Sequence, residues 1–154
     1  MTRLSFVPAA GRRAYPPRVS AFTQVFWDGL AQGSWQTTCC EACGRQTFPP
    51  RPICPHCWSD KVRWSPLSAR GTLYSWTRIH AAPAVFVPEA PYAVGIVDLD
   101  TGVRLACRLL ERPDTHWEPG IAVEMAVLQY EDGPLFAARP LPPHPDDSRS
   151  THAR

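Results

Sequence analysis

Two pairs of closely spaced cysteines constrain this chain more than any other feature. Cys40 and Cys43 form one C-x2-C pair, and Cys54 and Cys57 form a second pair after ten intervening residues. Four thiolates at this spacing complete the tetrahedral coordination of a Zn²⁺ ion, and Gly44 permits the tight turn that follows the first pair. A metal held by four protein ligands has no open position for water or substrate. The pattern therefore predicts a zinc site that is structural and not catalytic.

Other uses of the cysteines stay open. The same four ligands suit an iron site, and a C-x2-C pair also serves as a redox dithiol, although no βαβ pattern surrounds either pair. Cys39 adjoins the first ligand and is an alternative to Cys40, while His56 lies between two ligands and is an alternative metal ligand or a surface residue. Cys107 lies in the apolar run RLACRLL, where we expect a buried thiol that fills space in a core.

An amphipathic helix is predicted over residues 20–35, ahead of the cysteines. Apolar side chains recur there at the spacing of one helix face, Ser20 is a candidate cap at the start, and Gly33 is a candidate end. Two interpretations of this face are open. The helix packs on its own domain, or it docks on a partner protein, because an exposed aromatic stripe marks an interface. The side chains that form the candidate partner interface are Phe22, Phe26, Trp27 and Leu30.

The hydrophobic period changes to two after residue 70, which is typical of strands. Strand-like runs cover residues 71–81, 92–100, 103–111, 122–132 and 134–140, with turn signals at Asp100-Thr101-Gly102 and Asp132-Gly133. Five short strands with a long excursion after the first favour a closed barrel of the OB-fold type over residues 67–140. The fold class predicted is mainly β with an N-terminal helix: a rubredoxin-like zinc ribbon over residues 36–66, followed by a five-stranded OB-fold barrel.

Composition excludes several classes of protein. The 154 residues carry 18 prolines and a net charge of +2, which leaves room for one or two small domains without long helices. No window approaches the roughly 20 apolar residues of a membrane span, and no secretory signal opens the chain, so we expect a cytoplasmic protein. Residues 1–19 and 141–154 have the composition of disordered tails. Motifs for binding nucleotides or for serine hydrolase chemistry are missing from the sequence.

The order of these features resembles a bacterial and archaeal family that joins a rubredoxin-like zinc ribbon to an OB-fold, described as acyl-CoA-associated proteins. The resemblance covers about residues 20–140. This sequence departs from the family pattern at two positions. Trp58 stands where a glycine is common, and Cys39 stands where a basic residue is common. The residues that carry the resemblance are Phe26-Trp27-Asp28-Gly29-Leu30, Cys40 to Gly44, Phe48-Pro49-Pro50-Arg51, Cys54-Pro55, Cys57, Gly71-Thr72, Pro91-Tyr92 and Gly120.

The resemblance implies a non-catalytic partner of a thiolase-like enzyme, either a thiolase or a retro-aldol lyase. In such a complex this chain helps hold or channel an acyl-CoA thioester, the catalytic cysteine and histidines belong to the partner chain, and the assembly is a hetero-oligomer such as a heterotetramer. A CoA binder needs cations, an aromatic platform and an apolar groove. The candidates for this surface are Arg45, Arg51, Trp64, Trp76 and Arg78.

Two further functions compete with this one. Zinc ribbons and OB-folds both bind nucleic acid, but residues 67–140 carry a net charge of −3, against the basic groove that single strands require. We therefore expect no nucleic-acid partner. An autonomous enzyme is the other alternative, and the sequence displays no catalytic constellation that supports it.

Overall fold

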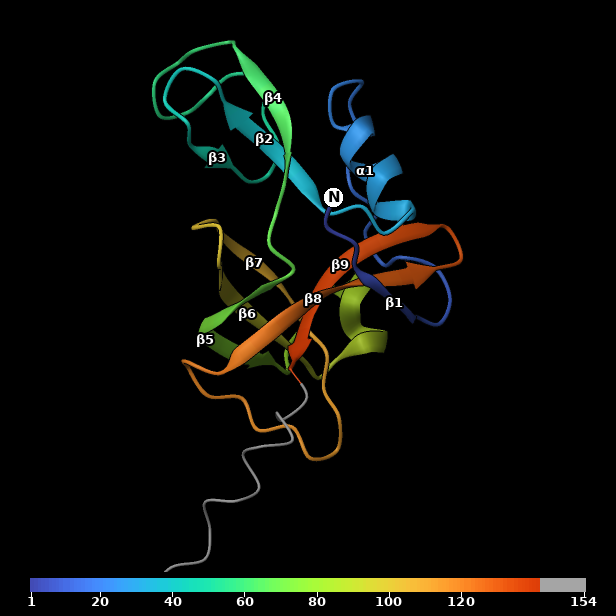
Figure 1. The fold of residues 1–154 in the computed structure, drawn as a ribbon. Helices are drawn as coiled ribbons and strands as arrows, with labels where there is room; N and C mark the ends of the chain where they lie inside the picture. Colours follow the sequence, from blue (N-terminus) through green and yellow to red (C-terminus); the bar gives the residue numbers. More distant parts are fainter. Residues whose placement is uncertain (142–154) are drawn as a thin grey trace, which may run out of the picture.

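The computed structural model describes residues 1–141 and builds a small sheet, a helix and a barrel from them (Figure 1). No helix within these residues has the length and apolarity that a membrane crossing requires. In chain order the elements are β1 (Ser5–Pro8), α1 (Gln24–Ala31), β2 (Gln36–Cys40), β3 (Gln46–Thr47), β4 (Val62–Pro66), β5 (Arg70–Ile79), the 3₁₀ helix η1 (Ala84–Glu89), β6 (Tyr92–Leu99), β7 (Arg104–Leu109), β8 (Ala122–Tyr130) and β9 (Gly133–Pro140).

The barrel matches the predicted OB-fold. Its strands follow the order β8-β5-β6-β7-β9, and pairing of β8 with β9 closes the ring. Buried and outward-facing side chains alternate along β6, so Ala93 and Val97 fill the interior together with Leu73 of β5 and Val123 of β8. Strands β5 and β6 approach closely at Gly71, where a Cβ atom would lie 2.4 Å from the carbonyl oxygen of Asp98.

The ribbon, residues 36–66, is a three-stranded antiparallel sheet in the order β3-β2-β4. Few large apolar side chains lie inside it. Its buried residues are Thr37 and Thr38 of β2 and the cysteines at or near the metal cluster, besides Pro50. The ribbon therefore depends for its stability on what binds the cysteines and on what packs against its inner edge.

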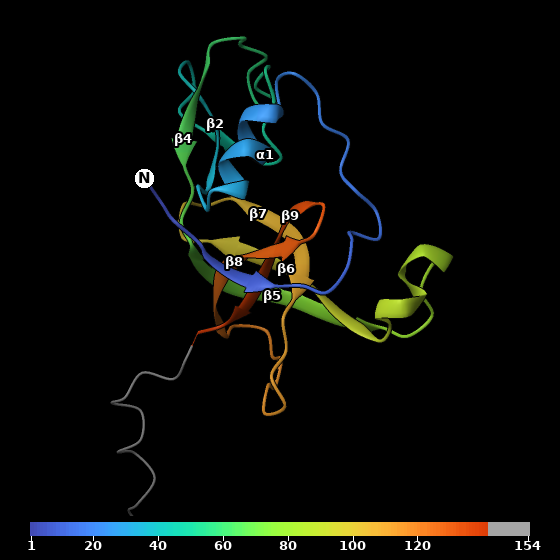
Figure 2. The same ribbon diagram turned by 90° about the vertical axis from the view of Figure 1, so that its right-hand side faces the viewer.

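An aromatic joint fastens the ribbon to the barrel. Phe26 of α1, Trp35 before β2, Phe48 after β3 and Phe136 of β9 contact one another with ring centroids 5.4 to 6.3 Å apart. Trp35 is fully buried, and its indole Nε1 donates to the carbonyl oxygen of Ser68, 3.0 Å away. Figure 2 shows α1 beside the ribbon strands β2 and β4 and above the barrel.

Helix α1 is shorter than the sequence predicts, and its face turns inward. It spans eight residues from an N-cap at Thr23, because Ser20 and Thr23 hydrogen-bond each other's groups in a preceding turn instead of opening the helix. Phe26 is 2% exposed and Leu30 is fully buried, both in this chain's own core. The prediction that these two side chains contact a partner is therefore wrong. Phe22 and Trp27 remain partly exposed.

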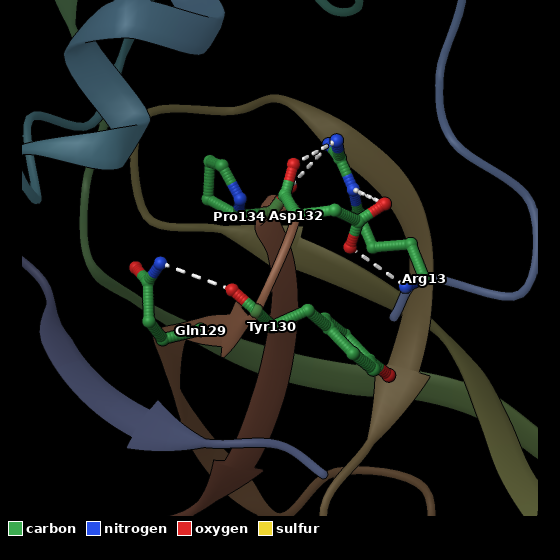
Figure 3. A network of polar contacts seen from close by, with 5 residues as sticks. All are labelled: Arg13, Gln129, Tyr130, Asp132 and Pro134. Atoms are coloured by element: carbon green, nitrogen blue, oxygen red, sulfur yellow. Dashed lines mark hydrogen bonds and ion pairs between the residues drawn. The ribbon is translucent and has the colours of Figure 1, made fainter. Parts of the chain in front are cut away.

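The prediction of a disordered tail over residues 1–19 is also wrong. Strand β1 pairs in parallel with residues 126–129 of β8, a stretch of edge that β5 leaves open because β5 pairs only with residues 122–124. Arg13 then fastens the arm to the β8–β9 turn (Figure 3): its backbone N–H donates to Asp132 and its guanidinium donates to the carbonyl oxygens of Asp132 and Pro134. The second predicted tail, residues 141–154, lies outside the described residues except for Leu141.

Candidate metal centre and ligand groove

The four predicted cysteines meet at one point of the ribbon. Cys40 ends β2, Cys43 follows it in a turn, and Cys54 and Cys57 come from the loop before β4. All four Sγ atoms lie within 4.8 Å of one another, with 3.5 Å between Cys40 and Cys57 and 3.6 Å between Cys43 and Cys54. Zinc bound to four sulfurs at about 2.3 Å separates those sulfurs by roughly 3.8 Å. The cluster therefore fits one tetrahedral ion.

The pKa values of these thiols show that the four sulfurs do not all ionise without a cation. The backbone N–H of Cys43 stabilises the thiolate of Cys40 and lowers its pKa to about 6. At Cys57 the backbone N–H of Ser59 also favours the thiolate, but the neighbouring thiol of Cys40 and burial outweigh it and raise the pKa to about 12. Four sulfurs this close cannot all ionise alone, whereas a divalent cation favours all four thiolates.

The alternative ligands lie outside this cluster. Cys39 is buried with its Sγ 3.5 Å from the carbonyl oxygen of Gly44, and the imidazole Nδ1 of His56 lies 3.5 Å from the guanidinium of Arg45. Trp58, where the family pattern has glycine, adopts a φ of 64°, in the left-handed region that favours glycine, and its side chain is 81% exposed. Tryptophan therefore keeps the turn after the last ligand at a conformational cost.

A groove of about 710 Å³ opens between α1, the segment after β3 and the outer face of β7. Trp27, Phe48 and Phe136 supply much of its apolar wall, and Arg18 and Arg51 are among the cations that line it. The backbone N–H of Arg51 donates to Thr38 Oγ1 at 3.0 Å, which holds the Phe48–Arg51 stretch against the ribbon. Within residues 1–141, neither arginine forms a salt bridge.

Arg104 completes the set of cations in the groove but is already engaged. Its guanidinium forms a salt bridge with Asp98 at 2.6 Å and lies over the ring of Tyr74, 3.8 Å from the centroid. Arg18 and Arg51 are therefore the cations that remain available to an anionic ligand in this groove.

The structure does not gather the five side chains that were predicted to bind CoA. Arg51 lines the groove, and Arg45 lies in a neighbouring polar cavity beside His56. Trp64 stacks on Phe22 with 5.5 Å between centroids, and Arg78 makes a two-pronged ion pair with Glu111. Trp76 of β5 is 37% exposed and lines neither cavity.

Sequence reasoning missed Arg18, Arg104 and Phe136 as members of the groove. Arg18 belongs to the segment that composition marks as disordered, Arg104 is an exposed position of β7, and Phe136 is a half-buried position of β9. No motif joins them. Only the closure of the barrel and the return of the N-terminal arm bring them together.

Comparison with known proteins assigns the chain to a family. The family model described as the rubredoxin-like zinc ribbon domain of ChsH2 matches residues 27–63, and the model of the ChsH2 C-terminal OB-fold domain matches residues 64–128. A DUF35 domain-containing scaffold protein of Methanocaldococcus jannaschii is 32% identical over 96 residues, which cover 61% of this chain and 68% of that protein. The chain is a member of the DUF35 family. The resemblance inferred from the cysteine spacing and the FPPR segment is confirmed.

Other DUF35 relatives carry more specific names. The benzoylsuccinyl-CoA thiolase subunit BbsA of Thauera aromatica is 35% identical over 74 residues, which cover 48% of this chain and 50% of that subunit. The solved structure of an Ltp2–ChsH2(DUF35) aldolase contains a chain that superposes with a TM-score of 0.70 and 28% identity, over 81% of this chain and 98% of that chain. The chain of that aldolase therefore shares the overall arrangement of this chain.

Proposed function

We propose that this protein is a non-catalytic accessory subunit of a thiolase-like enzyme, a thiolase or a retro-aldol lyase, and that it helps hold a CoA thioester. The groove carries the proposal, because two arginines without an ion-pair partner in the described residues lie on an apolar cleft. The names of the relatives, a thiolase subunit and a component of an aldolase, support the choice of enzyme.

The chemistry of the groove suits a CoA ligand. Guanidinium groups bind phosphate oxygens through charge-assisted, two-pronged hydrogen bonds, and Arg18 and Arg51 have that capacity available. The aromatic wall formed by Trp27, Phe48 and Phe136 suits the apolar part of the pantetheine arm. A volume of about 710 Å³ lies in the range of small-molecule sites.

The cysteines of this chain are unsuited to covalent catalysis. Cys107 faces the barrel interior, and burial raises the pKa of its thiol to about 12, so almost no thiolate forms at neutral pH. Four further sulfurs form the metal cluster, and an ion with four protein ligands offers no position to substrate. The remaining thiol, Cys39, is buried in the ribbon. The reacting groups are therefore expected on the partner chain, and a symmetric hetero-oligomer such as a heterotetramer follows if that partner is a dimer.

Single-stranded nucleic acid remains the weaker alternative. OB-folds bind it on the outer face of their second and third strands, here β6 and β7, through cations and aromatic rings. Arg104 and Arg108 on this face are paired with Asp98 and Glu89. The face therefore presents little unpaired positive charge to a phosphate backbone.

Calorimetric titration of CoA tests the proposal, with this chain co-expressed and purified with a thiolase-like chain of the same organism. Replacing Arg51 with Ala removes a charge-assisted phosphate contact and should weaken CoA binding by about 10- to 100-fold. Arg63→Ala, an exposed arginine of β4 away from the groove, is the matched control and should bind normally. A wild-type complex that fails to form, or that binds no CoA, contradicts the proposal.

A further inference from the structure

A second, smaller cavity lies on the outer face of the barrel beside the groove. It has a volume of about 300 Å³ and is bounded by η1, the outer faces of β6 and β7, the β8–β9 hairpin and the N-terminal arm. We call this cavity the outer hollow. Tyr15 of the arm forms part of its wall, and the contacts of Arg13 with the β8–β9 turn hold the arm in place (Figure 3).

The phenol of Tyr130 lines the outer hollow without a hydrogen-bond partner. Tyr130 belongs to β8 and is only 8% exposed. Within residues 1–141 its backbone carbonyl accepts a hydrogen bond from the Gln129 side chain, whereas its hydroxyl forms none. A polar group buried this deeply normally has a partner, because leaving it without one costs free energy. The hydroxyl is therefore a group that a ligand of the hollow can satisfy.

The polar groups of the hollow suit a neutral ligand. Burial, followed by the charge of Glu89, raises the pKa of the Tyr130 phenol above its ordinary value. The phenol therefore keeps its proton at neutral pH, and its O–H can donate to an acceptor oxygen. Among the described residues, the charged side chains that line the hollow are Glu89 and Arg108, and they form a salt bridge with each other. The hollow thus offers a donor without a net charge.

Aromatic rings from two sides form the apolar walls of the hollow. Phe86 of η1 packs against Tyr92 of β6 with 6.2 Å between centroids, and the Arg108 guanidinium lies 4.1 Å from the Tyr92 centroid. Tyr130 and Phe136 contribute rings from the β8–β9 hairpin. Walls of this kind favour a flat apolar body, which packs on the rings in offset or edge-on contacts.

The volume of the hollow limits the size of its ligand. An apolar cavity of roughly 150 Å³ holds benzene. The outer hollow, at about 300 Å³, therefore accommodates a molecule of roughly ten to twelve non-hydrogen atoms. A CoA thioester is several times larger, so a ligand that fills this hollow is a second molecule, distinct from the one proposed for the groove.

We propose that the outer hollow binds a small neutral molecule with a flat apolar ring and a carbonyl oxygen, and that this oxygen accepts a hydrogen bond from the Tyr130 hydroxyl. A bicyclic aromatic ketone such as 1-indanone has this chemistry and this size. Its ring packs on the aromatic walls while its oxygen partners the buried phenol. The site differs in kind from the groove, where Arg18 and Arg51 favour an anion.

Matched probes test the site on the full zinc-bound chain. 1-Indanone and indane have the same ring system and differ in the carbonyl oxygen. We expect 1-indanone to bind with a Kd of about 0.1 to 1 mM in NMR titrations, and indane to bind about three- to tenfold more weakly. The largest chemical-shift changes should fall at Val94, Ala106 and Tyr130. Indane-2-carboxylate carries a charge that the hollow does not neutralise and should bind more weakly than 1-indanone.

Tyr130→Phe removes the hydroxyl and keeps the ring. It should weaken 1-indanone binding about three- to tenfold, to the affinity of indane, and leave indane binding unchanged. Tyr74→Phe, at a β5 residue that is 54% exposed and does not line the hollow, is the matched control and should alter neither affinity. The melting temperature of Tyr130→Phe should not fall, because the hydroxyl has no partner within the described residues. A fall would reveal an internal partner and contradict the proposal.

Val94→Trp fills the hollow from an outward-facing, half-buried position of β6 and should abolish binding of both indane probes. Ile96→Trp adds the same bulk two residues along the same face without lining the hollow, and it should leave binding intact. The proposal is overturned if 1-indanone does not bind the wild-type chain, if the carboxylate binds more tightly, or if Tyr130→Phe keeps the preference for the ketone. Normal binding by a Val94→Trp chain with an unchanged melting temperature overturns it as well.

Discussion

The ribbon and the barrel achieve order by different physical means. The barrel buries a continuous apolar core, in which Leu73, Val97 and Val123 are fully excluded from solvent. The ribbon buries threonines, cysteines and a proline, and the two connections between its strands meet at the four cysteine sulfurs. The hydrophobic effect stabilises the first, and metal coordination stabilises the second. The apolar core reaches into the ribbon at the aromatic joint and at Trp64 of β4, which packs against the same cluster of buried side chains.

Loss of one metal ligand should have the largest effect and tests whether metal coordination stabilises the ribbon independently of the barrel. Cys54→Ser removes a buried thiolate, and because metal binding in so small a module is folding free energy, residues 36–66 should unfold while the barrel persists. Hydrogen exchange should show lost protection confined to the ribbon, with zinc content near zero by atomic absorption. Cys39→Ser is the control, since Cys39 is buried but lies outside the cluster. Retained zinc in the Cys54 variant would contradict the four-thiolate site.

A cavity in the barrel core should have the opposite effect to the loss of a metal ligand: the barrel should be destabilised and the metal site should stay intact. Leu73→Ala removes a fully buried side chain and should lower the free energy of unfolding by about 2 to 5 kcal/mol. Zinc content should stay at one ion per chain, because no metal ligand changes. Denaturant unfolding followed by tryptophan fluorescence measures the loss, and an effect below 1 kcal/mol would show that the barrel interior does not depend on this residue.

Acid should loosen the N-terminal arm through a single carboxylate, Asp132. The backbone N–H of Arg13, followed by its guanidinium charge, stabilises the carboxylate of Asp132 and lowers the pKa of that group. A lowered pKa means that the contact stabilises the fold above the ordinary pKa of aspartate, near 3.9, and that this contribution disappears as the pH falls through the lowered value. The protection factors of residues 9–13, which are exchange rates corrected for the intrinsic pH dependence of amide exchange, should therefore fall in acid, and Asp132→Asn should abolish that loss of protection.

Trp58→Gly has the smallest expected effect. It tests whether the backbone conformation after the last metal ligand destabilises the ribbon. Glycine adopts the positive φ of 64° without steric cost, although it loses more entropy on folding, so a net gain of about 0.5 to 1 kcal/mol is expected for the ribbon. Because Trp58 is 81% exposed, little packing is lost. Zinc affinity measured by competition with a chelator should rise slightly, and a fall would indicate that the exposed indole contributes to the fold.

The parts of this fold that sequence reveals are those with local signals. The metal cluster follows from the spacing of four cysteines, and the five barrel strands follow from alternation and turn residues. The inward face of α1 could not be decided in this way, because Phe26 has the same pattern whether it packs on Phe136 of this chain or on a partner. Strand β1 has only four residues, too few for a period, and it exists because β8 offers an open edge.

The aromatic joint fixes the width of the groove before any ligand arrives. Its rings come from the helix, the linker, the ribbon and the barrel, and three of these segments also wall the groove through Phe26, Phe48 and Phe136. The walls therefore cannot separate without breaking ring contacts that the fold already contains. Most of the entropy of ordering them is lost when the chain folds, so a ligand that fits the groove binds a preorganised site.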